Sequence, residues 1–255
     1  MNMTSFTDYF AILGTSVGLT YLLILTLLEI VLGIDNIIFI SIITDNLPKN
    51  KQRSARLIGL SLALIIRIVM LSLVSWIMTL DREPLFSVAG YSFTAHSLVL
   101  LIGGLFLIYK SVGEMHASVK GEEHDQKSKT YSTFSAAVLQ IVLIDFIFSF
   151  DSVISAIGMT NDISHETHGN PFIIIVLSVL ISMVVMMLFS GPISKFINER
   201  PTIKMIALSF LVAIGVMLIA EGFGEHLQKG YIYFAFVYAL IVELLNLRMR
   251  KNQQK

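Results

Sequence analysis

The sequence predicts an all-α protein that crosses a membrane several times. Of its residues, 55% are hydrophobic and only 14% are charged, and the mean hydropathy is +0.78, values far from those of soluble domains. The chain contains no cysteine, which excludes disulfides, thiolate metal sites and cysteine nucleophiles. Its formal net charge is zero. Composition therefore indicates the lipid bilayer as a partner and gives no support for nucleic acid.

Seven apolar segments follow one another, each near the length of about 20 residues that a helix needs to cross hydrocarbon. The expected spans are 19–43, 57–80, 95–113, 134–159, 171–194, 202–221 and 231–247. Prolines, glycines and charged runs separate them, as expected of loops. In order, these breaks are Asn46-Leu47-Pro48, Asp81–Pro84, Lys120–Lys129, Gly169-Asn170-Pro171, Glu199-Arg200-Pro201 and Lys229-Gly230.

The basic residues predict how the chain is oriented, because cytoplasmic loops are enriched in Lys and Arg. Those of the odd-numbered loops and of the tail fall on one side: Lys49, Lys51, Arg53, Arg56, Lys110, Lys120, Lys127, Lys129, Lys195, Arg200, Lys204, Arg248, Arg250, Lys251 and Lys255. The even-numbered loops carry only Arg82 and Lys229. We therefore expect a multi-pass protein of the cell membrane with its N-terminus outside the cytoplasm and its C-terminus inside.

The first and fourth spans carry the same acidic pattern at membrane depth. The first contains Glu29, Asp35 and Asn36, and the fourth contains Asp145, Asp151 and Ser152 at the same spacing. A carboxylate at the centre of a bilayer costs about 2.5–3.5 kcal/mol, so intramembrane acids are functional candidates by default. Finding the arrangement twice points to a duplicated cation-binding half-site.

The donor types and their spacing indicate what such a site binds. Carboxylate, amide and hydroxyl oxygens suit Mg²⁺, Ca²⁺ or Mn²⁺. On a straight helix, positions i and i+6 lie about 120° apart around the axis and roughly 9 Å apart along it. Either the helices loosen near Gly33 and Ser149, or the two acids of each motif serve successive positions on a path. Arg67, inside the second span, is expected to pair with one of the four acids.

A longer internal repeat includes both motifs. The segment Gly104–Glu114 of span three matches Gly215–Glu225 around span six in its glycines and final acid. Spans one to three therefore match spans four to six, which predicts one membrane transport domain over 1–255, with repeats at 19–116 and 134–226 and an additional helix at 231–247. Three spans are an odd number, so the second repeat is inverted and the substrate site is expected near the midplane. Within the repeat, Lys110 and Glu221 are candidates for a path or a structural role.

Four separated motifs resemble those of the TerC family of integral membrane proteins: Leu28–Asn36, Gly103–Lys110, Phe148–Ala156 and Ile219–Gly224. The resemblance implies an architecture similar to LysE-type exporters and a role in Mn²⁺ export and in metal supply to exported proteins. It also implies that the family's acidic metal positions fall on Asp35 and Asp151, with Asn36 beside the first. Some relatives carry a C-terminal regulatory domain. This chain is expected to be a compact member without one.

Together these features predict a divalent metal cation transporter, with Mn²⁺ as the first candidate and Ca²⁺ or another divalent cation as the alternative. We expect the metal as cargo and no permanently bound cofactor. No Gly-x-x-x-x-Gly-Lys-Ser/Thr motif occurs, so energy is expected from an ion gradient or the membrane potential. Four crowded acids cannot all stay ionised without their cation, which predicts coupling to protons, with Glu29 and Asp145 as the proton carriers.

Other functional classes fit parts of the sequence. An amino-acid or small-solute exporter of LysE type would need a cationic partner for the substrate carboxylate, and Arg67 is the candidate. An accessory protein could hand metal to the secretion machinery or to exported metalloproteins. An intramembrane aspartyl protease would carry Gly-x-Gly-Asp, whereas this chain has Leu32-Gly33-Ile34-Asp35, so no enzymatic activity is expected.

Overall fold

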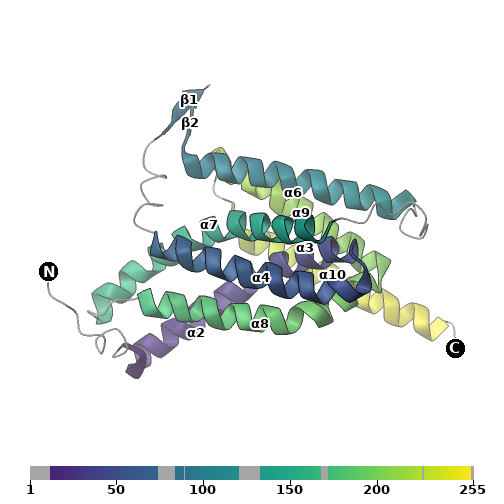
Figure 1. The fold of residues 1–255 in the computed structure, drawn as a ribbon, viewed down its shortest axis with the longest axis horizontal. Helices are drawn as coiled ribbons and strands as arrows, with labels where there is room; N and C mark the ends of the chain where they lie inside the picture. The colour runs from purple at the N-terminus through teal and green to yellow at the C-terminus, as the bar shows by residue number, and fades with distance from the viewer. Residues whose placement is uncertain are drawn as a thin grey trace. The chain divides into compact units, whose positions relative to one another are not determined.

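The computed structural model describes residues 12–73, 84–88, 90–120, 133–167, 172–225 and 227–253, with the backbone alone between 151 and 167. Nearly all of these residues lie in helices (Figure 1), which confirms the all-α polytopic membrane class. Six spans in this part of the chain are long and apolar enough to cross a membrane. A further apolar helical segment, Phe134–Phe150, is shorter than these six.

The helices extend beyond the predicted spans at most of their ends. Their bounds are η1 Ile12–Gly14, α2 Ser16–Leu32, α3 Ile34–Asp45, α4 Lys49–Ser72, α6 Ala95–Lys120, α7 Phe134–Thr167, α8 Phe172–Asn198, α9 Pro201–Gly222 and α10 Lys229–Gln253. The basic residues Lys49–Arg56, expected in a loop, therefore form the first turns of α4. Lys204, counted with the basic residues around the fifth loop although it falls inside the predicted span 202–221, is buried in the first turn of α9. Hydropathy marks only the part of a helix inside hydrocarbon, whereas the helix itself continues until a Pro or Gly ends it.

A small β-hairpin was not predicted by the sequence reasoning. Strand β1, Phe86–Val88, pairs antiparallel with β2, Tyr91–Phe93, and Val88 lies opposite Tyr91. Gly90 in the turn has a φ of 88°, a left-handed conformation that glycine adopts without steric cost. The rings of Tyr91 and Phe93 pack edge-on against Phe223 at the end of α9, with centroids 5.5 and 5.7 Å from it.

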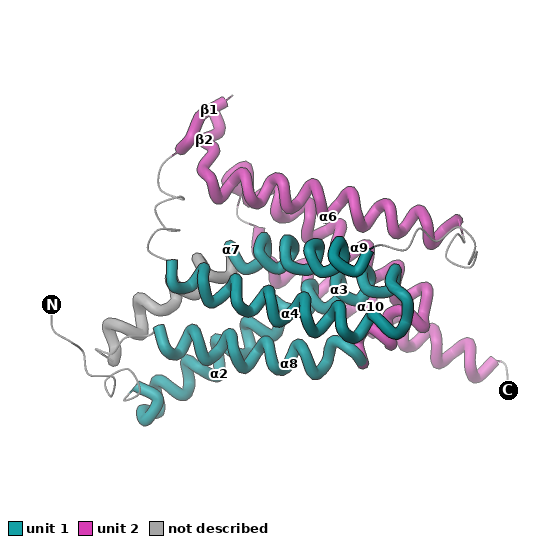
Figure 2. Tube along the Cα trace, in the orientation of Figure 1, with its two compact units in different colours: residues 1–79, 133–191 teal, residues 80–132, 192–255 magenta. Residues whose placement is uncertain are grey.

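The described helices form two compact units (Figure 2). The first, which we call unit 1, contains α2, α3, α4, α7 and α8 as far as Gly191. Its apolar core includes a buried cluster of Leu25, Leu71 and the α8 residues Ile174 and Val179. Helix α3 is buried at every residue from Asp35 to Thr44, so it presents no face to lipid. The helix that begins with Asp35 and Asn36 is thus an interior helix.

Unit 2 contains α6, α9, α10 and the hairpin. Helix α10 packs on α9 through stacked rings of Phe210 and Phe236, whose centroids are 4.2 Å apart. Its most apolar stretch has no buried residues, and large apolar side chains such as Phe234 and Tyr238 are exposed. A helix with an apolar exposed surface of this kind is suited to contact with lipid.

Helices α6 and α9 meet at two glycines. A Cβ at Gly104 would lie 2.5 Å from the carbonyl oxygen of Gly215, and a Cβ at Gly215 would lie 2.9 Å from the carbonyl oxygen of Gly104. The neighbours are reciprocal too, since Gly104 faces Ile219 and Gly215 faces Ile108. Elements related by a two-fold axis make contacts of this self-complementary kind. Gly104 and Gly215 are the positions that the sequence match pairs, and the inverted repeat stays a prediction that this contact supports.

Candidate functional site

The first membrane span breaks at Gly33. Helix α2 ends at Leu32 and α3 begins at Ile34, while Gly33 has φ −93° and ψ −1° and donates its N–H to the carbonyl of Ile30 at 3.2 Å. A Cβ at Gly33 would overlap the sulfur of Met186 on α8. Of the two alternatives left open by the sequence, the first motif therefore has the loosened helix. The second motif does not, because α7 runs unbroken from Phe134 to Thr167 and a serine costs a helix less than a glycine does.

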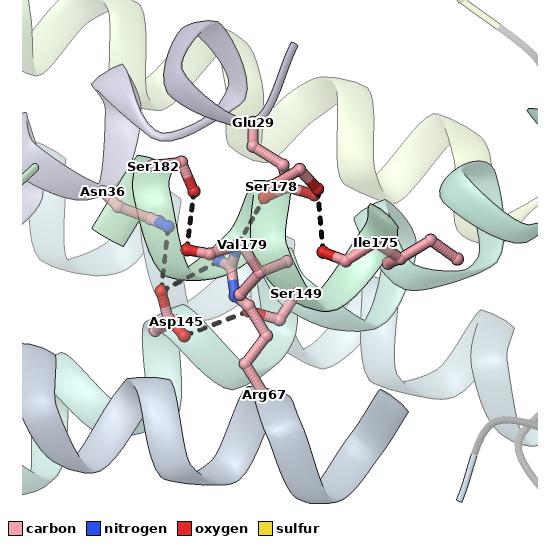
Figure 3. Close-up of polar contacts among 9 residues, drawn as sticks. All are labelled: Glu29, Asn36, Arg67, Asp145, Ser149, Ile175, Ser178, Val179 and Ser182. Carbon is pink, nitrogen blue, oxygen red and sulfur yellow. Dashed lines mark hydrogen bonds and ion pairs between the residues drawn. The ribbon is translucent and has the colours of Figure 1, made fainter. Parts of the chain in front are cut away.

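Arg67 on α4 bridges the two acidic motifs of the sequence. Its Nη1 contacts Glu29 Oε2 of α2 at 2.5 Å, and its Nη2 contacts Asp145 Oδ1 of α7 at 3.2 Å (Figure 3). The three side chains are 3%, 8% and 1% exposed. The sequence predicted that Arg67 pairs with one acid, and the structure has it paired with two.

Asp145 also links the two motifs directly. Its Oδ1 accepts a hydrogen bond from Asn36 Nδ2 at 3.1 Å, and its Oδ2 accepts one from Ser149 Oγ at 3.0 Å (Figure 3). A carboxylate only accepts, so the contact fixes which end of the Asn36 amide faces Asp145. The other end, Asn36 Oδ1, is buried and has no hydrogen-bond partner within the described part of the chain. This oxygen can accept a hydrogen bond or ligate a cation.

Asp35 lies at the start of the buried helix α3. Its side chain is 3% exposed, and its Oδ1 accepts from the backbone N–H of Asn36 at 3.1 Å. The unpaired N–H groups at a helix N-terminus carry a partial positive charge, which stabilises an acid in the first turn. Glu29, Asp35 and Asp145 carry one negative formal charge each, and Arg67 offsets one of the three. The four residues thus have the formal charge that a divalent cation would neutralise.

Asp151 and Ser152 lie on α7, and their side chains fall outside the described part of the structure. Their role as ligands stays a prediction. Among the side chains that the structure describes, no three His, Cys, Asp or Glu converge as a ready metal site. The oxygens assembled here are of mixed types, since the amide of Asn36 and the hydroxyl of Ser149 accompany the acids. A complete cation site would require further donors or a movement of Arg67.

Helix α8 adds polar groups that the sequence reasoning missed. Ser178 and Ser182 are buried, and their hydroxyls donate to the carbonyls of Ile175 and Val179 at 2.8 and 2.9 Å (Figure 3). Their hydroxyl oxygens keep lone pairs that can accept or ligate. Met186, which lies beside Gly33, is one turn beyond Ser182 on the same face of α8. The spacing of Ser178, Ser182 and Met186 at four-residue intervals was the available signal.

Lys110 and Glu221 belong to unit 2, and Lys110 is partly exposed on α6. Glu221, at the end of α9, lies 3.9 Å from Lys229 Nζ through its Oε1. Their assignment as path or structural residues stays a prediction.

Comparison with known proteins identifies the family. Residues 15–255 match the family described as "Integral membrane protein TerC family". The chain is 45% identical to the "UPF0053 inner membrane protein YoaE" of Escherichia coli K12 over 232 residues, which is 91% of this chain but 43% of that protein. The chain thus spans less than half of YoaE.

Two further relatives are matched over most of their length. The "UPF0053 protein" of Haemophilus influenzae Rd is 43% identical over 90% of this chain and 93% of its own. The "UPF0053 inner membrane protein YgdQ" of E. coli K12 is 44% identical over 89% and 92%. No solved structure matches the chain. With a family match over nearly its whole length and relatives this similar, the chain belongs to the TerC family of integral membrane proteins.

Proposed function

We propose that this protein is a transporter that moves a divalent metal cation out of the cytoplasm, with Mn²⁺ as the first candidate cargo. The observation that carries the proposal is the buried polar cluster at the broken first span. There the start of α3, with Asp35 and Asn36, is joined to Asp145 of α7 by a hydrogen bond. Broken helices with acids at the break are the usual way in which transporters bind ions inside a membrane.

The chemistry of the cluster favours a hard divalent cation. Every candidate ligand is an oxygen: the carboxylates of Glu29, Asp35 and Asp145 and the free amide oxygen of Asn36. Mg²⁺, Ca²⁺ and Mn²⁺ prefer such donors. The choice of Mn²⁺ among these rests on the resemblance to the TerC family. In this proposal Asp151 and Ser152 of α7 complete the ligand set as the second half-site.

The amino-acid exporter is less well supported. It depends on Arg67 to receive a substrate carboxylate, but Arg67 already bonds two carboxylates of the protein itself. Its Nε is buried without a partner within the described residues, but both Nη atoms are already engaged by carboxylates of the protein, so a substrate carboxylate would have to compete with Glu29 and Asp145 for the guanidinium. A cation is the better match for a cluster whose acids outnumber its base.

The proposal includes location and direction. The names of YoaE and YgdQ place those relatives in the inner membrane, and we propose the same membrane for this chain, with the N-terminus outside the cytoplasm. In this orientation the basic loops face the cytoplasm, and export moves the cation from the cytoplasm to the outside.

Proteoliposomes test this function. Purified protein is reconstituted with a manganese-sensitive dye inside, and Mn²⁺ is added outside under a defined pH gradient and membrane potential. The proposal expects dye quenching that needs the protein, saturates with Mn²⁺ and is lost in Asp35→Asn. Empty liposomes give the background. A rate equal to background for every divalent cation tried would refute transport by this chain alone and favour the accessory role.

A further inference from the structure

The guanidinium of Arg67 lies next to two acids that the sequence marks as candidate cation ligands. It lies between Glu29, the first acid of the pattern in the first span, and Asp145, the first acid of the pattern in the fourth span, and contacts both (Figure 3). These acids come from α2 and α7, and Arg67 comes from a third helix, α4. The protein thus carries its own positive charge between its two acidic half-sites.

The contacts of Arg67 are incomplete for a purely structural ion pair. A buried pair is favourable only when its geometry is good and its remaining donors are satisfied. Nη1 and Nη2 each contact a carboxylate, but Nε is buried with no hydrogen-bond partner within the described residues. A buried polar group left unsatisfied in a native structure calls for an explanation. One explanation is that the guanidinium is held for only part of the working cycle.

We propose that Arg67 is a tethered counter-ion that the divalent cargo displaces. This inference rests on the proposed function. In the cargo-free state Arg67 offsets one of the two negative charges of Glu29 and Asp145 and stays bonded to both, so the empty carrier can change conformation without leaving either acid unpaired in the membrane interior. When the cation binds, it takes over these carboxylates and the guanidinium moves away. Cargo and Arg67 therefore compete for the same oxygens, and their binding is mutually exclusive.

Asn36 and Ser149 make this exchange possible. Both donate to Asp145 independently of Arg67, one to each oxygen. Asp145 therefore keeps two hydrogen bonds when the guanidinium leaves, and its position is held for the incoming ion. Asn36 Oδ1, buried and without a partner in the described structure, is positioned to become a ligand in the same step.

The competition predicts an increase in cation affinity when Arg67 is removed. Binding of Mn²⁺ to purified protein would be measured by calorimetry for the wild type, Arg67→Gln and Arg67→Lys. Arg67→Gln is expected to bind about tenfold more tightly, within the usual range of coupling between competing ligands, and to transport more slowly because the empty state lacks its counter-ion. Arg67→Lys keeps a competing charge and is expected to stay near the wild type.

Leu71→Ala is the matched control. Leu71 is a fully buried residue of the same helix in the apolar core of unit 1. Its truncation is expected to lower the melting temperature without changing Mn²⁺ affinity. A merely structural Arg67 would behave in the same way, so equal or weaker Mn²⁺ binding by folded Arg67→Gln would overturn the displacement.

A second pair of variants covers the case in which Arg67→Gln does not fold. Glu29→Gln with Arg67→Gln removes one charge of each sign, and it is compared with Glu29→Gln alone. The double variant must bind Mn²⁺ more tightly than the single variant if Arg67 competes with the cargo; unchanged or weaker binding overturns the inference. If the wild type itself binds no divalent cation, the proposed function fails too, whereas wild-type binding combined with weaker binding in the variants rejects the displacement alone.

Discussion

Replacing Gly104 by alanine tests the contact between α6 and α9. The new Cβ would lie 2.5 Å from the carbonyl oxygen of Gly215 and 2.8 Å from Cγ1 of Ile219. The carbonyl belongs to the backbone of a helix and cannot rotate away, so the two helices must separate. Overpacking of this kind costs about 1–3 kcal/mol.

Gly113→Ala is the matched control, because Gly113 is on the same helix and nothing lies within 4 Å of the Cβ that it would gain. Both variants gain the same helix propensity, about 1 kcal/mol, so their difference isolates the contact. We expect Gly104→Ala to be less stable than Gly113→Ala by about 1–3 kcal/mol. The assay is unfolding by SDS in mixed micelles, followed by far-ultraviolet circular dichroism. Equal stability of the two variants would refute the close approach of α6 and α9 at this position.

Three further predictions concern unit 1. Gly33→Ala favours a continuous first span by about 1 kcal/mol and crowds Met186. We therefore expect Mn²⁺ transport by this variant to fall roughly fivefold. Gly230→Ala is its control and should transport normally, because nothing lies within 4 Å of the Cβ that Gly230 would gain. Arg67→Ala leaves two buried acids without their shared cation and should lower the unfolding free energy by about 3–5 kcal/mol in metal-free detergent; a loss below 1 kcal/mol would mean that the pair is dispensable. Adding Mn²⁺ to weakly buffered protein between about pH 6 and 8 tests the proton coupling expected from the sequence: proton release would support it, and an unchanged pH would favour a uniporter driven by concentration or membrane potential.

Much of unit 1 followed from the sequence because charged residues in a membrane have few options. An acid or arginine buried in hydrocarbon must find a partner of opposite charge or a ligand, so Arg67 was expected beside an acid. A loosened first span at Gly33 was one of two alternatives, and it was favoured there because glycine is a weak helix former. The pairing of Asn36 with Asp145 agrees with two motifs meeting at one site.

Other features depend on tertiary structure that spacing does not encode. The two motifs have the same spacing, yet only the helix of the first motif is interrupted. Ser149 of the second motif stays helical while its hydroxyl donates to Asp145. Ser178 and Ser182 look like ordinary residues of an apolar span, and only their burial beside the bonded carbonyls of α8 marks them. The hairpin β1–β2 was missed because three-residue strands are too short to show a periodic pattern.

The proposed function requires the paired acids to carry a divalent cation across the membrane. The most direct measurement is Mn²⁺ flux in proteoliposomes containing the wild type, Asp35→Asn or Asp151→Asn at equal protein content. Each substitution keeps the shape of the side chain and removes its formal charge. We expect saturable flux for the wild type and flux at the empty-liposome level for both variants, with all three proteins folded by circular dichroism. Wild-type flux through either variant would contradict it.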